Sequence, residues 1–144
     1  MKVEIRQQGF DPFLEVSTYQ SELNIAGQYG ASAFFVGSMR DFNEGDNVSK
    51  MVLEHYPGMT EKYLEKISRE AIERWGLLDS LIIHRVGEIN SADPIVLVAV
   101  WSAHRAAAFE ASRHLMEELK SKAPFWKKET LDNGERWVGK NTPG

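Results

Sequence analysis

Four lysines flank two aromatic residues in the stretch KSKAPFWKKE, at residues 120 to 129. They are Lys120, Lys122, Lys127 and Lys128. A lysine that acts as a base or nucleophile needs its pKa lowered from ~10.4, which partial burial and a neighbouring cation both promote. A lysine that only holds a phosphate needs no such shift. Lysines crowded against an apolar corner therefore suit either proton transfer or the binding of an anion.

A plainer interpretation covers part of this cluster. Lys120 and Lys122 fall in the last turn of a predicted helix, where the helix dipole favours a cation by ~0.3–1 kcal/mol. Lys127 and Lys128 are not explained in this way, because they follow two aromatic residues that should anchor a turn. If Trp126 is packed, it holds Lys127 over whatever this corner faces.

Three further cations follow strands or begin a helix. His104 and Arg105 lie where a buried strand becomes a helix, and free N–H groups at such a junction attract anions. A helix cap with a solvated arginine explains this pair equally well. Arg40 ends another strand, in GSMRD. We predict that three loops bring Arg40, His104, Arg105, Lys120 and Lys127 to one basic pocket.

Composition excludes several kinds of chemistry. The sequence has 144 residues, a net charge of −4 and no cysteine, so disulfides, thiolate metal sites and a cysteine nucleophile are ruled out. The four histidines lack metal-binding spacing, so neither a metal nor another cofactor is expected. Glu54 and His55 are adjacent in a predicted strand and point to opposite faces, so we interpret them as structural.

Charge and hydropathy indicate the setting. Residues 104 to 144 carry eight Lys/Arg against six Asp/Glu, and the remainder carries nine against fifteen. A basic patch on an acidic body suits a small anionic ligand better than nucleic acid. The longest apolar run, residues 95 to 101, is far shorter than the ~20 residues that span a membrane, and no signal peptide is evident. We expect a cytoplasmic protein of one domain, residues 1 to 144.

The pattern of apolar residues predicts an α+β fold with a mostly antiparallel sheet and packed helices. Thr60 should cap the clearest helix and Gly76 should end it. The apolar run IVLVAVW is continuous enough for a strand at the centre of the sheet. In the last helix, Phe109 should face the protein core. DFNEGDN should form a loop. Strands are predicted at residues 3–6, 30–40 (mostly buried), 48–55, 80–89 and 94–102, helices at 14–23, 60–75 and 105–122, and a hairpin at 131–138 turning at Asn133 and Gly134.

Five segments resemble the large, catalytic subunit of molybdopterin synthase. They are LEHYPGMTEK, HRVGEI, SAHRAAAFEA, LKSKAPFWKKE and GERWV, in that order between residues 34 and 138. The resemblance implies an α/β-hammerhead fold. It also implies a homodimer of large subunits that binds a small ubiquitin-like subunit at each end, giving a heterotetramer.

The activity implied by this resemblance is a sulfur transfer. The family converts cyclic pyranopterin monophosphate, also called precursor Z, into molybdopterin by installing two dithiolene sulfurs. These sulfurs arrive on the C-terminal thiocarboxylate of the small subunit, whose Gly-Gly tail enters the large subunit. A sulfurtransferase without cysteine cannot carry sulfur itself, so delivery by a partner fits the composition.

The resemblance also assigns roles to residues. Lys120 and Lys127 match the two catalytic lysines. The remaining matches are substrate-binding residues: Ser38, Met39, Arg40, His104, Arg105, Lys128 and Glu129. The resemblance implies that His104 and Arg105 bind the phosphate end of the substrate and come from the other protomer. A competing interpretation is a non-catalytic module or scaffold that binds a phosphorylated pterin or nucleotide-like ligand without converting it.

Overall fold

The computed structural model describes residues 1–43, 46–131 and 134–137. The elements follow one another as β1 (Lys2–Arg6), α1 (Pro12–Glu22), β2 (Ala31–Ser38), β3 (Phe42–Asn43), β4 (Asp46–His55), α2 (Met59–Trp75), β5 (Asp79–Arg85), β6 (Gly87–Asn90), β7 (Pro94–Ser102), α3 (Arg105–Lys122), β8 (Phe125–Leu131) and β9 (Gly134–Trp137). Part of the predicted hairpin turn, at Asn133, lies outside the described residues.

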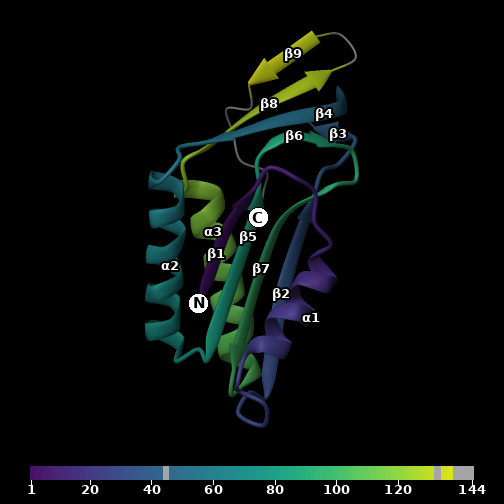
Figure 1. Cartoon of the computed structure of the whole chain (residues 1–144). Helices are drawn as coiled ribbons and strands as arrows, with labels where there is room; N and C mark the ends of the chain where they lie inside the picture. Colours follow the sequence, from purple (N-terminus) through teal and green to yellow (C-terminus); the bar gives the residue numbers. More distant parts are fainter. Residues whose placement is uncertain (44–45, 132–133, 138–144) are drawn as a thin grey trace.

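Two β-sheets form the framework (Figure 1). The first has the strand order β1-β5-β7-β2, and the second has the order β3-β4-β8-β9 with β6 paired to β4. Among the described strands, β1 and β5 are parallel and every other pair is antiparallel. The predicted α+β class with a mostly antiparallel arrangement is confirmed.

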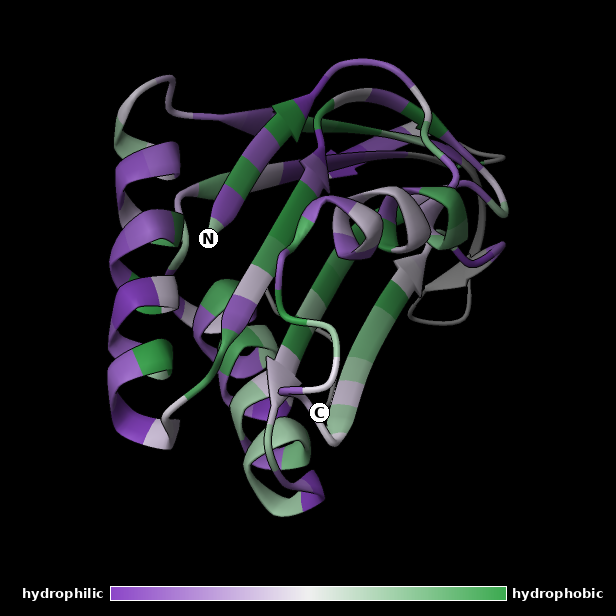
Figure 2. Cartoon of the chain, turned by 60° about the horizontal axis from the view of Figure 1, so that its bottom comes forward, coloured by the Kyte–Doolittle hydropathy of each residue, from purple (hydrophilic) through white to green (hydrophobic). Residues whose placement is uncertain are grey.

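Helices cover both faces of the first sheet. Ile82, Val96, Val98 and Val100 pack against α2 and α3, whereas the intervening residues of β5 and β7 pack with Val16 and other residues of the α1 side. Burial on both faces explains the unbroken apolar run in β7, which is interior as predicted. In Figure 2 hydrophobic colour follows the central strands, and α2 is largely hydrophilic on its outer side.

The second sheet lies across one end of the first, and a separate core cluster fills the junction. Six buried residues form it: Met39, Met51, Leu53, Val86, Ile89 and Ile95. The predicted single strand at residues 80–89 is wrong, because the chain leaves the first sheet after β5 and enters the second as β6. The break occurs at Gly87, whose φ of 83° is readily adopted only by glycine.

Two predictions near the edge of the first sheet are also wrong. The segment DFNEGDN is not a loop throughout, since it contains β3 and the start of β4. The strand predicted at 30–40 is the shorter β2, and it is an edge strand rather than a buried one. Phe34 and Phe35 are 47% and 45% exposed. An aromatic-rich composition predicts a strand but does not show whether the strand is central.

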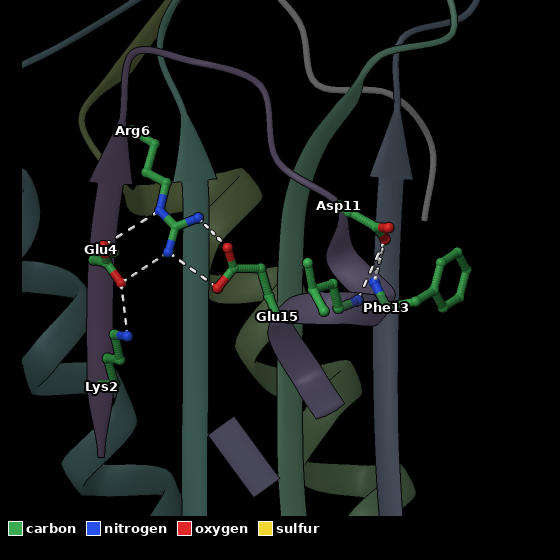
Figure 3. A network of polar contacts seen from close by, with 7 residues as sticks. Lys2, Glu4, Arg6, Asp11, Phe13 and Glu15 are labelled. Atoms are coloured by element: carbon green, nitrogen blue, oxygen red, sulfur yellow. Dashed lines mark hydrogen bonds and ion pairs between the residues drawn. The ribbon is translucent and has the colours of Figure 1, made fainter. Parts of the chain in front are cut away.

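Arg6 connects β1 to α1 (Figure 3). Its guanidinium donates hydrogen bonds to Glu4 in the same strand at 3.1 and 3.2 Å, and to both carboxylate oxygens of Glu15 in α1, one at 3.0 Å. Asp11 caps α1 by accepting from the backbone N–H groups of Phe13 and Leu14. This cap starts the helix at Pro12, two residues before the predicted start.

Thr60 does not cap α2, because Gly58 occupies the N-cap position and its N–H donates to Glu61. Thr60 is fully buried instead. Its Oγ1 accepts from the N–H of Tyr56 at 3.0 Å and donates to the carbonyl of Pro124 at 3.1 Å. The hydroxyl therefore joins the end of β4 to the segment between α3 and β8.

We expect Thr60→Val to lower the free energy of unfolding by about 1–3 kcal/mol, because valine removes both part-buried hydrogen bonds of the Thr60 hydroxyl. Urea titration followed by circular dichroism measures the loss. Thr18→Val, at an exposed position of α1, is the matched control and should change stability by less than about 0.5 kcal/mol. Equal stability of the two variants would contradict the structural role of the hydroxyl.

Candidate active site

Strand β8 places Lys127 and Lys128 on opposite faces. Side chains alternate along a strand, so Phe125, Lys127 and Glu129 share the inner face, while Trp126 and Lys128 share the outer face. The predicted aromatic anchor, Trp126, is 47% exposed and does not pack as expected. Phe125 is the anchor instead, because it packs against the cores on both sides of the sheet junction.

Lys120 lies in the last turn of α3, partly buried beside the core residue Leu119, whereas Lys122 is exposed. Burial, and after it the charge of Lys127 and a hydrogen bond with Lys127, lower the pKa of Lys120 to about 7. The two lysines therefore meet, although α3 and β8 deliver them separately. Such a pKa makes the neutral amine of Lys120 accessible near pH 7, whereas an isolated surface lysine is neutral in only about one molecule in a few thousand.

The apolar cluster between the sheets provides the low-polarity surroundings of this lysine pair. Lys127 is the cross-strand neighbour of Leu53, which is 1% exposed, and Phe125 is the neighbour of His55. His55 was interpreted from the sequence as structural, yet it shares the inner face of the second sheet with Lys127.

Met39 is buried in the cluster with Leu53, while Ser38 and Arg40 on either side of it are exposed. The end of β2 and the end of α3 lie at the same end of the first sheet, beneath the second (Figure 1). The buried Met39 thus fixes the backbone of Arg40 at the edge of the cluster that borders the lysine pair.

Lys128 and Glu129 take part in the β8–β9 hairpin. The Lys128 ammonium lies 2.8 Å from a carboxylate oxygen of Glu135 and 5.7 Å from the centre of the Trp137 ring. Its pKa is raised by the hydrogen bond with Glu135. Glu129 is 6% exposed and accepts a hydrogen bond from Arg136 at 3.0 Å. Glu129 shares the inner face with Lys127, whereas Lys128 does not.

His104 and Arg105 lie at the opposite end of α3 from Lys120. Lys120 lies fifteen positions after Arg105 in the α-helix, a rise of about 22 Å. Both residues are exposed, and the His104 side chain makes no capping hydrogen bond. One chain therefore does not bring all five cations together, because a rigid helix holds His104 and Arg105 away from Lys120. A single pocket with all five needs this pair from another copy, as the resemblance implies.

A groove of about 670 Å³ runs between β2 and α3 and ends at Lys120. Phe34, Phe35, Phe109 and Met116 line it, together with polar residues of α3. Phe109, predicted to face the core, is 67% exposed. In the single chain, the aromatic side chains that line this groove are exposed to solvent.

His84 is a residue of this region that the sequence did not reveal. It lies on β5, is 3% exposed, and stacks on the Phe125 ring with centroids 4.0 Å apart. Burial first, and then the charges of Lys120, Lys127 and His55, lower its pKa to about 3. A lone histidine in the apolar run LIIHRV carries no spacing signal that separates a site residue from a core residue.

The lowered pKa of Lys120 predicts a dependence of stability on pH. The folded chain releases this proton near pH 7, whereas an unfolded lysine keeps it to about pH 10.4. The unfolded state then binds more protons between these values, so stability rises with pH there. Urea titrations from about pH 6 to 9 should show a rise above pH 7 that Lys120→Met lacks. Identical slopes in both proteins would contradict the assigned protonation.

Fold and site together define an α+β protein with a lysine pair at the junction of two sheets. The family described as MoaE protein matches residues 11–122. The molybdopterin synthase catalytic subunit of Pseudomonas aeruginosa PAO1 is 49% identical over 138 residues, which cover 96% of this chain and 90% of that protein. The chain belongs to the MoaE protein family.

Solved structures agree with this assignment. The molybdopterin biosynthesis MoaE protein from Burkholderia ambifaria MC40-6 superposes with a TM-score of 0.81 at 45% identity, covering 99% of this chain and 92% of that one. A complex of subunits 1 and 2 of the molybdopterin-converting factor from Helicobacter pylori 26695 contains the same fold, with a TM-score of 0.79 at 23% identity, covering 96% and 90%.

These relatives confirm two predictions: the fold class, and an enzymatic role as a sulfurtransferase of molybdenum cofactor biosynthesis. In the part of the chain that the structure describes, none of the helices is long and apolar enough to cross a membrane.

Proposed function

We propose that this chain transfers two sulfurs from the C-terminal thiocarboxylate of a small ubiquitin-like subunit to cyclic pyranopterin monophosphate, forming the dithiolene of molybdopterin. The observation that carries the proposal is the Lys120 amine, whose pKa of about 7 results from burial beside Lys127. A base near neutrality next to a cation suits a reaction that moves protons while an anionic sulfur attacks.

The two lysines divide this work. Lys120, in its neutral form, accepts a proton from the substrate or from water. Lys127 stabilises negative charge that develops during attack. In each transfer a carbon–sulfur bond forms on the pterin as a carbon–oxygen bond of the substrate breaks, and the displaced oxygen leaves as water or stays on the phosphate. The acyl–sulfur bond of the small subunit breaks in the same transfer. Water supplies the oxygen that turns the acyl group into a carboxylate.

Residues at the edge of the junction hold the substrate. Arg40 contacts an anionic group of the pterin, and Ser38 and Met39 shape the adjoining surface. Glu129, on the same strand face as Lys127, lies at the far side of the pair. Lys128 points to the other face of β8, so its contribution is the weakest of the predicted set.

The phosphate end of the substrate requires a second copy of this chain. His104 and Arg105 cannot reach Lys120 in the same molecule, since about 22 Å of α3 separates them. We infer a homodimer in which the second copy brings these two residues to the lysine pair. The exposed aromatic groove between β2 and α3 suits burial in such a contact.

The small subunit completes the assembly. The Helicobacter pylori structure is a complex of two subunits, 1 and 2. A small subunit on each copy of the present chain would give a heterotetramer.

The cytoplasmic location and the single domain over residues 1 to 144 remain predictions. A pure binding module is not favoured, because holding a phosphorylated ligand gives no reason to lower the pKa of a buried lysine.

Reconstitution tests the proposal. Purified chain, thiocarboxylated small subunit and precursor are mixed under single-turnover conditions, and dithiolene is measured by derivatisation of the pterin product. We expect dithiolene only when all three components are present, and none when the small subunit ends in a carboxylate. If the folded chain binds precursor and the small subunit but forms no product, the proposal is wrong and the chain is a binding module.

A further inference from the structure

We propose that His84 is a positioning residue for the lysine pair: its buried ring clamps Phe125 and thereby holds Lys127 against Lys120. This inference rests on the proposed function only for the consequence to catalysis. The placement itself follows from the packing of three elements, β5, β8 and α3.

His84 is fixed in orientation. Its Nδ1 lies 2.8 Å from the carbonyl oxygen of Arg85, and since a carbonyl only accepts, Nδ1 carries the proton and donates. On β5, His84 lies on the same face as Ile82, which packs against α2 and α3. The ring therefore faces the helix layer that carries Lys120.

The stack on Phe125 transmits this position to β8. The two rings are nearly parallel, with 18° between their planes and centroids 4.0 Å apart. Phe125 is the first residue of β8, and its N–H donates to the carbonyl of Ala123 at 2.8 Å. Because alternate residues of a strand share a face, fixing Phe125 also fixes Lys127, two residues further along.

The charge of the ring matters as much as its position. Three positive or titratable groups face His84: Lys120 from α3, Lys127 from β8 and His55 from β4. With a pKa of about 3, the imidazole stays neutral throughout the working range. It fills the space beneath the pair without a further positive charge and excludes water from the Lys120 amine.

Removing the ring should therefore raise the pKa of Lys120. In His84→Ala, water enters and Lys127 is no longer held in place, so both causes of the low value weaken. A rise of about one unit reduces the neutral fraction of Lys120 at pH 7 about fivefold. The single-turnover rate should fall by a similar factor at pH 7 and recover near pH 9. His84→Phe keeps the stack and should keep the pKa near 7.

The direct test is an NMR titration of Lys120 in protein labelled with ¹³C at lysine Cε, assigned with Lys120→Arg. His84→Ala, His84→Phe and wild type are compared, and His114→Ala, whose ring on α3 contacts Trp75 of α2, is the control. If His84→Ala does not fold, Phe125→Leu removes the other ring of the stack and should raise the same pKa. Thermal unfolding is measured in parallel.

The pKa of Lys120 in these variants distinguishes a positioning role of His84 from a purely structural one. A raised Lys120 pKa in His84→Ala or Phe125→Leu, but not in His84→Phe or His114→Ala, supports positioning by the stacked ring. Lower melting temperatures with an unchanged Lys120 pKa would reduce His84 to a core residue and overturn the inference. The titration needs no substrate, so its result does not depend on the proposed function. The proposed function fails separately, if wild-type protein with a lowered Lys120 pKa forms no dithiolene.

Discussion

Lys120→Ala should lower the single-turnover rate of dithiolene formation by about 10²–10⁴, the usual contribution of a positioned proton-transfer group. The reason is specific to this lysine: burial and Lys127 make its amine neutral near pH 7. Lys127→Ala should also reduce the rate strongly, because it removes the cation and raises the pKa of Lys120 at the same time. Precursor binding should weaken much less than the rate falls.

Two further variants show what Lys120 does. Lys120→Arg keeps the positive charge but cannot lose a proton, so it should be nearly as inactive as Lys120→Ala if the neutral amine is required. Lys122→Ala is the matched control, because Lys122 is exposed two residues along the same helix and pairs with Glu118 at 3.1 Å. It should keep nearly full activity. An active Lys120→Arg would mean that Lys120 only supplies charge.

The second large effect is complementation between inactive chains. Arg105→Ala and Lys120→Ala should each be severely impaired alone, since each removes one half of every site. Mixed and allowed to exchange, they should regain about one quarter of wild-type activity. Half of the dimers are then mixed, and one of the two sites in each mixed dimer has both residues intact.

The complementation test distinguishes a shared site from a site within one chain. Activity of the mixture is measured after subunit exchange and compared with the sum of the separate variants. Arg69→Ala, an exposed residue of α2 paired loosely with Glu65 at 3.9 Å, replaces Arg105→Ala in the control and should be active by itself. No recovery after verified exchange would remove Arg105 from the site.

The strongest periodic signals predicted their elements well. The last helix spans Arg105–Lys122, the residues predicted, because a long amphipathic pattern ended by Pro124 leaves few alternatives. The central position of β7 followed from its continuous apolar run. The motif match and the aromatic residues before Lys127 predicted that Lys127 lies opposite Lys120, and the two lysines do interact.

Other predictions failed where a residue's surroundings come from distant parts of the chain. Phe34, Phe35 and Phe109 look like core residues by type, yet they lie on an open groove. Thr60 has the composition of a helix cap, but its hydroxyl is used by Pro124, 64 residues further along. Local pattern states which residues can be buried, and tertiary packing decides which ones are.

Tertiary packing also limits how many residues of the candidate site the sequence can predict. Lys120 and Lys127 stand out in the sequence because charge crowded around aromatic residues is unusual, and Arg40 because it ends a strand, so all three are predicted site residues. His84 is hidden in an apolar strand, and its importance comes from a ring contact with Phe125, 41 positions away in the sequence. The predicted length of α3 already separates Arg105 from Lys120 within one chain, which agrees with the expectation that the other protomer contributes the His-Arg pair.

In the proposed dimer, that length would make α3 a spacer whose residue count is itself constrained. Deleting one residue between Arg105 and Lys120 would shorten the helix by about 1.5 Å and turn one end relative to the other by about 100°. Both half-sites would then point the wrong way, although each kept its own residues. We expect homologous proteins to vary in the loops around α3 while keeping this interval free of insertions and deletions.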